Sequence, residues 1–494
     1  MRCIECEEIE LARVRDERPA QALELPHAAL DGFAAGRSPR DLTRRRLLQW
    51  GVAGVASVYG PKALGWESVW ESVAAEAALD QNCLVLLYLA GGNDGLNTIV
   101  PAAPADYSAY VAARSAIHRG QGASADGRVG SQPLAGTAGQ LLAFSNVMVS
   151  TAGGGDNGDI HGLDTLYGDG ALAVMPAVDA KKYSLSHFDN SDIWFKASYD
   201  LNIKTGWLGR WIDRNGSATN PLQAISIDTA LSKSIRTAVN PVCAIPSLSS
   251  LGFSMNSPGG TGAVNVNAQM QALASQPAGA SNAYLARARG TYAVAVETHQ
   301  RSLSGPAYAP GAGYPNNGTL STRLRLAAHL LSANLGTRII TIHWGGFDNH
   351  SGQLASQDAQ LMELSRALGA FRADLTARGI EQRVATLVFS EFGRRVAENG
   401  SAGTDHGAGG LMLAMGSGVR GGLASEWPGC RPQDLVPANN PAQGNLKVPT
   451  DYRSVYRAVI DEWLGDDPDA IIGGGAIDPL VRGDGAAGRA LFDG

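Results

Sequence analysis

Ten side chains that can take part in metal or ester chemistry are gathered in five short stretches of this sequence. They are Asp94, Ser186, His187, Asp189, Asp348, His350, Glu391, Arg394, Asp405 and His406. Two carboxylates about 4 Å apart repel by roughly 4 kcal/mol at an effective dielectric near 20, so converging carboxylates need protons or cations. Histidines among them favour a divalent metal, and such ligands suit zinc, manganese or iron better than calcium.

Each stretch follows an apolar run that predicts a buried β-strand. The four runs are Cys83–Leu89, Leu172–Val178, Arg338–Ile342 and Val384–Phe389. Because their apolar character is continuous rather than alternating, we expect an α/β fold with a largely parallel sheet flanked by helices on both faces. Ligands of such sheets bind outside the carboxyl ends of the strands. If the strands are parallel, all five stretches therefore lie along one edge.

Helical periodicity supports the same fold class. Apolar residues recur at helical spacing over Thr319–Leu335, Leu354–Arg378 and Tyr452–Leu464. The last of these helices ends before Gly465, a plausible terminator. By contrast, residues 246–317 are rich in Ser, Gly, Ala, Asn and Pro, which predicts an irregular insertion.

Taken alone, each stretch also has a structural interpretation. Asp94 lies in a glycine-rich turn, Asp348 and Ser186 each precede a predicted helix that they could cap, and Glu391 could pair with Arg394 at a strand end. The segment around His406 could be an ordinary loop. No Walker-type phosphate loop, G-x-S-x-G elbow or H-E-x-x-H motif is present. Only the joint placement of the stretches after strands favours a site.

Composition narrows the classes of function. The chain of 494 residues has a formal net charge of −6, which leaves no basic footprint for nucleic acid. Beyond the amino-terminal segment, no apolar run is long enough for a stable membrane span. Cys83 opens an apolar run and is expected to be buried, whereas Cys243 and Cys430 lie in loop-like sequence and could pair in an oxidising compartment.

The amino-terminal segment has the pattern of a twin-arginine export signal. Arg44 and Arg45 follow a threonine and precede a short apolar run, Leu47–Tyr59, with a small-residue cleavage site at Ala75–Ala77. The alternative is a basic turn before a buried helix. We therefore predict a leader and linker over residues 1–78 and a single domain over residues 79–494. The twin-arginine machinery would deliver that domain to the periplasm or the cell exterior.

Six motifs together resemble the family called domain of unknown function 1501. They are LVLLYLAGGNDGLNTIVP, SLSHFDNSDIW, TGWLGRWID, WGGFDNHSGQ, VFSEFGRRVAENGSAGTDHG and DYRSVYRAVIDEWLG. They run in collinear order from about Leu84 to Leu464. The resemblance implies a branch of the alkaline-phosphatase-like superfamily, whose members hydrolyse or transfer phosphate and sulfate esters with one or two bound metals.

The resemblance also implies roles for individual residues. The metal-binding positions of the superfamily match Asp94, Asp348, His350, Glu391, Asp405 and His406, and Ser186 takes the place of the nucleophile. Arg394 could offset charge on the transferred group. Two departures stand out. Phe392 occupies the place of a histidine and cannot bind metal, and Glu391 is one methylene longer than the aspartate expected there.

Two functions follow as hypotheses. The first is an exported metal-dependent hydrolase of a phosphate or sulfate ester, acting on a small molecule or a polymer. The second is a catalytically degenerate member of the fold that serves as an extracytoplasmic binding or assembly protein. The aromatic residue at Phe392 favours the second hypothesis, whereas the retained carboxylates with His350 and His406 favour the first.

Overall fold

The computed structural model describes ten parts of the chain. They are residues 57–59, 81–120, 133–136, 139–149, 162–247, 313–315, 318–437, 444–473, 477–488 and 490–493. All of them belong to one compact unit, Ala53–Gly494. The twin-arginine motif, the cleavage site at Ala75–Ala77 and nearly all of the predicted insertion lie outside the described residues.

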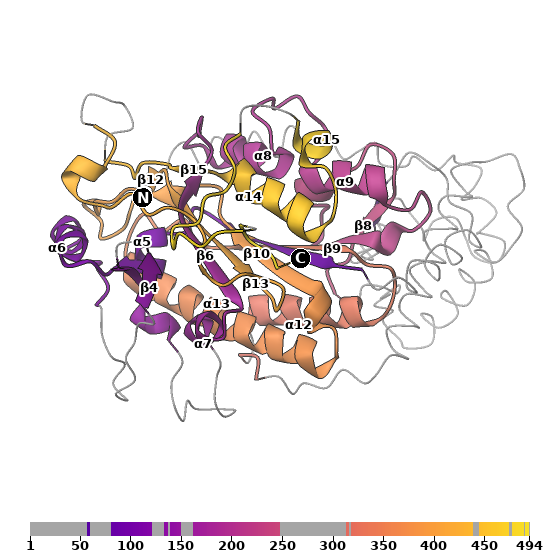
Figure 1. The fold of residues 1–494 in the computed structure, drawn as a ribbon, viewed down its shortest axis with the longest axis horizontal. Coiled ribbons are helices and arrows are strands. Elements are labelled where there is room, and N and C mark those ends of the chain that lie inside the picture. Colours follow the sequence, from indigo (N-terminus) through magenta and orange to yellow (C-terminus); the bar gives the residue numbers. More distant parts are fainter. Residues whose placement is uncertain are drawn as a thin grey trace, which may run out of the picture. The chain divides into compact units, whose positions relative to one another are not determined.

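A mixed, mostly parallel sheet forms the centre of this unit (Figure 1). Its strands run in the order β1-β8-β7-β9-β2-β10-β13-β6-β14, and β15 pairs with β6. The four predicted runs are β2 (Cys83–Ala90), β6 (Leu172–Asp179), β9 (Ile339–Gly345) and β10 (Val384–Phe389). The remaining strands are β1 (Ser57–Tyr59), β7 (Ala224–Ile227), β8 (Val242–Ala244), β13 (Gly410–Met415), β14 (Gly422–Leu423) and β15 (Thr450–Asp451).

The pairing confirms that the four predicted strands share one direction. β2 is parallel to both β9 and β10. The strand β13 lies between β10 and β6 and is antiparallel to each, so that β6 runs the same way as β10. Their carboxyl ends therefore meet at one edge of the sheet. The short β1 falls in the apolar run predicted to belong to the leader, and it pairs antiparallel with β8.

Helices cover both faces of the sheet, as predicted. One face carries α7 (Leu163–Gly168), α12 (Thr319–Ser332) and α13 (Gln353–Ala377). The other carries α8 (His187–Lys196), α9 (Trp207–Asn215) and α14 (Tyr452–Ala458), which continues as the π-helix η7 (Val459–Trp463) (Figure 1). Smaller helices are α5 (Gly95–Thr98), α6 (Pro104–Ala113), α15 (Pro468–Ile472), η1 (Asn146–Met148), η2 (Pro221–Gln223), η3 (Lys233–Ile235), η5 (Glu381–Arg383) and η6 (Pro432–Asp434).

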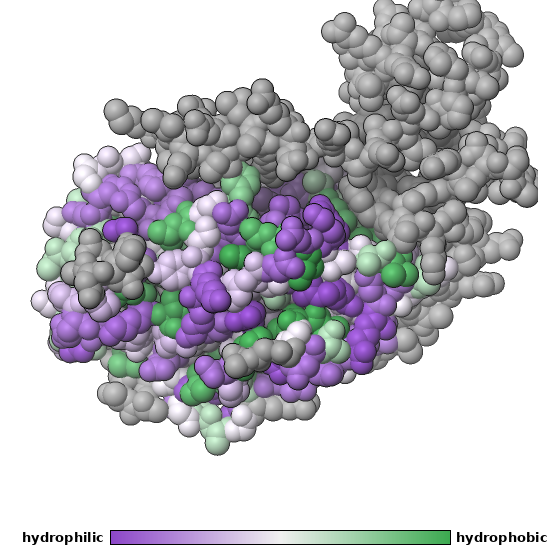
Figure 2. Space-filling view, turned by 90° about the horizontal axis from the view of Figure 1, so that it is seen from above, coloured by the Kyte–Doolittle hydropathy of each residue, from purple (hydrophilic) through white to green (hydrophobic). Residues whose placement is uncertain are grey.

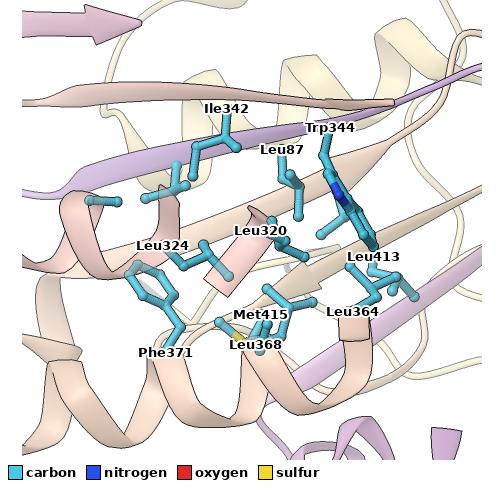
Figure 3. Close-up of a cluster of buried hydrophobic side chains, with 14 of the residues drawn as sticks. Leu87, Leu320, Leu324, Ile342, Trp344, Leu364, Leu368, Phe371, Leu413 and Met415 are labelled. Atoms are coloured by element: carbon cyan, nitrogen blue, oxygen red, sulfur yellow. The ribbon is translucent and has the colours of Figure 1, made fainter. Parts of the chain in front are cut away.

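Alternation along the strands divides the core into two clusters. In β2, Val85 and Leu87 face α12 and α13, whereas Leu84 and Leu86 face α8 and α14. Figure 3 shows the first cluster, in which Leu87 and its strand neighbours meet leucines of both helices. Burying one such side chain stabilises the fold by about 1.5–3 kcal/mol. A sheet buried on both faces explains why its strands are apolar throughout.

Two small sheets extend the framework at its edge. The two-stranded sheet joins β11 (Gly393–Arg394) to β12 (His406–Gly407), and the three-stranded sheet has the order β3-β5-β4. Its strands are β3 (Ile99–Pro101), β5 (Gly139–Phe144) and β4 (Pro133–Gly136). Because β11 follows β10 directly, the pairing with β12 brings His406 to the carboxyl edge of the main sheet.

The described cysteines do not pair. Cys243 lies in β8, not in a loop, and Cys430 is buried near α6; both thiols are free. Burial raises the pKa of Cys430 to about 12 and that of Cys243 further. The pairing of Cys243 with Cys430, which the sequence left open, is not formed. Burial of Cys83, by contrast, is confirmed.

The surface mixes polar and apolar residues. Figure 2 shows one face on which hydrophilic and hydrophobic residues are interspersed rather than segregated. Among the described residues, the large hydrophobic side chains that are exposed are Leu201, Val239 and Val481. No helix in this part of the chain has the length and apolar character needed to cross a bilayer.

Candidate metal centre

Three histidines and one aspartate meet at the carboxyl edge of the sheet. His187 is the first residue of α8, which follows β6 through a short loop. Asp348 and His350 lie in the loop after β9, and His406 lies in β12. Glycines allow the loops to approach so closely. A Cβ on Gly91 would collide with the backbone nitrogen of Asp348, and Gly91 has a φ of +119°, a conformation that favours glycine.

The Asp348 carboxylate is the centre of the group. Its Oδ1 lies 3.0 Å from Nε2 of His350 and 3.1 Å from Nε2 of His406, and its Oδ2 lies 3.6 Å from Nε2 of His187. The Nε2 atoms of His350 and His406 are 3.0 Å apart. Ligand atoms of His187, Asp348 and His406 all lie within 4.8 Å of one another, close enough for a single metal ion.

Each imidazole has an acceptor behind it. Nδ1 of His187 lies 2.7 Å from Oε1 of Glu391, and Nδ1 of His406 lies 2.8 Å from the carbonyl oxygen of Leu185. The third ring, His350, has Asp405 at 3.5 Å from its Nδ1. Carbonyl and carboxylate oxygens only accept, so Nδ1 of the first two rings carries the proton and a neutral ring presents the lone pair of Nε2.

In this arrangement, hydrogen-bond acceptors on the imidazoles face the carboxylate of Asp348, which is also an acceptor. In the neutral form, Nε2 of His187 and of His406 points a lone pair toward the negative carboxylate of Asp348, with no proton between them. Arg394, at 2.7 Å from Oδ1, offsets the charge of the carboxylate, and a bound proton or a cation would satisfy the facing lone pairs. A ring fixed through Nδ1 by an outer oxygen is the usual arrangement of a histidine that binds metal through Nε2. The donor set of imidazole and carboxylate therefore fits the predicted divalent transition metal.

The side chains of the group differ in the direction of their pKa shifts. Burial opposes ionisation of Asp348, but its three histidine neighbours and Arg394 hold the pKa of that carboxyl far below its usual range. Burial lowers the pKa of His187, yet its interactions with Asp348 and Glu391 outweigh that effect and raise the pKa to about 9. For His406, burial dominates and the pKa is lowered. His187 is thus the ring that takes up a proton when no metal competes.

Three of the residues predicted as ligands lie together in this group, and two others lie on the outer side of the imidazoles. Asp348, His350 and His406 form the group itself. Glu391 and Asp405 contact the rings of His187 and His350 from the outer side. Residue His187 was recognised as part of the cluster, but the resemblance gave it no role. In the sequence, the only indication of a role for His187 was its position shortly after a predicted strand.

Asp94 lies apart from this group. Its Oδ2 accepts from Nη1 of Arg114 at 2.5 Å and from Nε2 of Gln353 at 2.5 Å, and its Oδ1 caps α5 by accepting from the backbone N–H of Leu96. The Arg114 side chain is fully buried. Both carboxylate oxygens of Asp94 are therefore occupied, and the structure gives no contact between Asp94 and the histidines.

Arg394 and Ser186 also have specific partners. The guanidinium of Arg394 is fully buried and donates to Asp348 at 2.7 Å and to the carbonyls of four residues, which are Gly91, Gly92, Phe347 and Thr404. Arg394 thus holds Asp348 and the surrounding loops in place. Ser186 is the N-cap of α8, and its Oγ accepts from the backbone N–H of Asp189 at 3.5 Å. Ser186 precedes His187 directly in the chain.

Phe392 forms an apolar wall of the centre. Its ring is fully buried, 4.9 Å from the ring of His187 and 4.5 Å from that of His406, measured between centroids. The space next to the two imidazoles is therefore filled by hydrocarbon. Together with the engagement of Asp94 by Arg114, this leaves ligands for one cation rather than two among the described residues.

Comparison with known proteins finds one family that matches part of this chain. The profile of a family described as "Protein of unknown function (DUF1501)" matches residues 264–443, which confirms the resemblance over that part of the chain. No curated protein gives a significant sequence match.

Two solved structures are distantly similar. One is the lipoteichoic acid synthase LtaP from Listeria monocytogenes, with 8% identity, a TM-score of 0.25 and coverage of 76% of this chain and 71% of that chain. The other is the PsFucS1 sulfatase from Pseudoalteromonas sp., with 12% identity, a TM-score of 0.32 and coverage of 90% and 81%. At these values neither likeness supports an inference about activity.

Proposed function

We propose that this protein is a metal-dependent hydrolase of a phosphate or sulfate ester and that it holds one divalent cation. The residues that would bind the cation are His187, Asp348, His350 and His406. The observation that carries the proposal is that imidazoles, each with an acceptor behind Nδ1, present Nε2 to one carboxylate. A cation there would polarise the ester and lower the pKa of the attacking group.

Exposure of the group is consistent with access by a substrate. The Asp348 side chain is 34% exposed and that of His350 is 32% exposed, whereas Glu391, behind His187, is 1% exposed. The amino terminus of α8 adjoins the group, and the positive end of a helix attracts an anionic ester. Sulfate and phosphate esters, both anionic, fit this environment.

Ser186 is the proposed nucleophile. Its Oγ would bond to phosphorus or sulfur as the bond to the alcohol oxygen breaks, and the hydroxyl proton would leave with the alcohol. Water would then cleave the serine ester, release phosphate or sulfate and restore the hydroxyl. Serine is a weak nucleophile until its proton is withdrawn, and a cation held next to Ser186 would lower the pKa of its hydroxyl.

The test starts with metal analysis of the purified mature protein and a screen of phosphate and sulfate esters. On the ester that the screen finds, Ser186→Ala should lower turnover at least about a hundredfold with metal content unchanged. Ser191→Ala, later in α8, is the matched control and should keep wild-type turnover. Equal turnover by wild type and Ser186→Ala would leave a water molecule as the attacking group.

The second candidate is an extracytoplasmic binding or assembly protein that has lost hydrolysis. Two points favour it: Phe392 stands where the resemblance puts a metal-binding histidine, and Asp94, which the resemblance puts among the ligands, is engaged by Arg114. Metal bound by the wild type without turnover of any ester in the screen would support this candidate over the hydrolase.

We further propose that the protein is exported by the twin-arginine route to the periplasm or the cell exterior. The proposal rests on the sequence around Arg44 and Arg45, which lies outside the described residues. Replacing both arginines with lysine should leave the precursor in the cytoplasm, as fractionation would detect. Normal accumulation of the double variant outside the cytoplasm would contradict the proposal.

A further inference from the structure

We infer that Glu391 is a positioning residue that fixes His187 for metal binding and does not itself bind the cation. The inference rests on the metal centre of the proposed function. It also departs from the resemblance, which put Glu391 among the ligands.

Both oxygens of Glu391 lie against other protein groups rather than at the cation position. Oε1 accepts from Nδ1–H of His187 at 2.7 Å and from the backbone N–H of Gly91 at 2.9 Å. Oε2 lies 3.1 Å from the hydroxyl of Ser390. The side chain is 1% exposed, so no solvent replaces these partners. Compared with an aspartate, the additional methylene carries the carboxylate behind the ring of His187.

A second contact ties the same helix to the same residue. The Nδ2 of Asn190, which is fully buried, donates to the backbone carbonyl of Glu391. Asn190 lies one turn after His187 in α8, so the first turn of the helix is attached to the end of β10 at two points. The backbone contact sets where α8 begins, and the side-chain contact sets the rotation of the His187 ring.

The charge of Glu391 matters for a different reason. The Glu391 carboxylate accepts from Nδ1–H of His187 and from the backbone N–H of Gly91, so it lies directly behind the imidazole. A carboxylate hydrogen-bonded to the far nitrogen of a ligating imidazole orients the ring and raises its basicity. Removal of such an outer partner typically weakens metal binding about 10–100-fold.

Glutamine is a discriminating replacement at this position. Its Oε1 can accept the same two N–H groups, and its Nε2–H can donate to Ser390 Oγ, because the serine proton is directed to the carbonyl of Leu89 at 2.6 Å. Glu391→Gln therefore keeps the orientation of His187 and loses only the charge. Glu391→Ala loses both.

The experiment titrates Co²⁺ into full-length wild type, Glu391→Gln and Glu391→Ala and follows affinity, stoichiometry and the visible spectrum of bound Co²⁺. We expect Glu391→Ala to bind about 10–100-fold more weakly and Glu391→Gln to stay within about tenfold of wild type. Both should retain the wild-type stoichiometry and spectrum. Glu381→Ala, at the opposite end of β10, is the control and should bind as wild type.

Three outcomes would overturn the inference. They are wild-type affinity in Glu391→Ala, an altered Co²⁺ spectrum in Glu391→Gln, and equal losses in the two variants. If Glu391→Ala fails to fold, the affinity and spectrum of Glu391→Gln decide alone. If the wild type binds no metal, the proposed function fails. A crystal structure of Glu391→Ala then tests the positioning role separately, since an unchanged His187 rotamer would contradict it.

Discussion

Two aspartates that follow neighbouring parallel strands have opposite surroundings. Asp94, after β2, is 3% exposed and is paired with the buried guanidinium of Arg114. Asp348, after β9, is 34% exposed and faces three imidazoles in addition to the buried guanidinium of Arg394. The charge of an arginine is permanent, so Asp94 is neutralised by the fold itself. An imidazole can give up its proton, so the three imidazole partners of Asp348 can exchange protons for a metal.

A third aspartate shows what happens without either kind of partner. Asp179 ends β6, is fully buried and accepts from the backbone N–H groups of Ala180 at 2.8 Å and Gly409 at 3.0 Å. Burial raises the pKa of Asp179 to about 7, and these two hydrogen bonds offset the effect only in part. An aspartate that follows a strand is therefore not identified as a metal ligand by its position alone. The groups that contact its carboxylate determine whether it can bind a metal.

The largest effect should come from removing Arg114, the permanently charged partner of Asp94. Arg114→Ala leaves Asp94 buried and unpaired, which should lower the free energy of unfolding by about 3–5 kcal/mol in urea titrations. Metal affinity should stay at the wild-type value once the variant is folded. Arg214→Ala removes a half-exposed ion pair with Asp466 and should cost less than about 1 kcal/mol. A large loss of metal affinity in folded Arg114→Ala would erase the distinction between the two aspartates.

The next effect concerns the uncompensated Asp179. Its folded-state pKa of about 7 exceeds the 3.8 of an aspartate in the unfolded chain, so its stabilising contribution is complete below about pH 4. As the pH rises to 7, the unfolded chain ionises while the folded protein does not, and wild type loses up to about 4 kcal/mol relative to Asp179→Asn.

Urea titrations of wild type and Asp179→Asn across this pH range measure that difference. Asp200→Asn, at an exposed aspartate, is the control and should differ from wild type by a nearly constant amount. A constant difference for Asp179→Asn as well would show that Asp179 is ionised in the folded protein throughout.

A somewhat smaller effect is expected from the imidazoles around Asp348, which can exchange protons for a metal. At zinc, manganese or iron concentrations about a hundred times the dissociation constant, binding should stabilise wild type by about 3 kcal/mol. His406→Ala, which removes one ring, should gain less than about 1 kcal/mol under the same conditions. His118→Ala, outside the group, should keep the full gain. Equal melting temperatures with and without all three metals in wild type would contradict the metal centre.

Prediction from the sequence was accurate where long apolar runs determine the structure. The strands β2, β6, β9 and β10 and the helices α12 and α13 lie within a few residues of their predicted positions. Convergence at the carboxyl edge follows from their shared direction. The antiparallel β13 was not predicted, although Gly410–Met415 is apolar. Its direction could not have been inferred in any case, because antiparallel and parallel strands buried on both faces have the same pattern.

The side-chain contacts at the carboxyl edge of the sheet could not be predicted from the sequence. Arg114 lies 20 residues after Asp94 with no motif between them, so nothing in the sequence indicated their ion pair. Similarly, Glu391 and His187 are 204 residues apart, and only the docking of α8 on β10 brings them together. Sequence patterns could place ligand-type residues along one edge, but the contacts that separate ligands from their supports are tertiary.

The smallest predicted effect separates two roles of Ser186, which precedes His187 directly in the chain. As the N-cap of α8, Ser186 contributes a hydrogen bond at 3.5 Å, so Ser186→Ala should cost about 1 kcal/mol or less in free energy of unfolding. Asparagine is an equally good cap but has no hydroxyl, so Ser186→Asn should keep the stability of wild type within a few tenths of a kcal/mol. If Ser186 is the nucleophile, both variants lose turnover although only one loses stability. If it acts only as a cap, turnover follows stability, and Ser186→Asn remains active. Chemical denaturation and the ester assay, applied to the same three proteins, therefore distinguish a serine that reacts from one that only starts a helix.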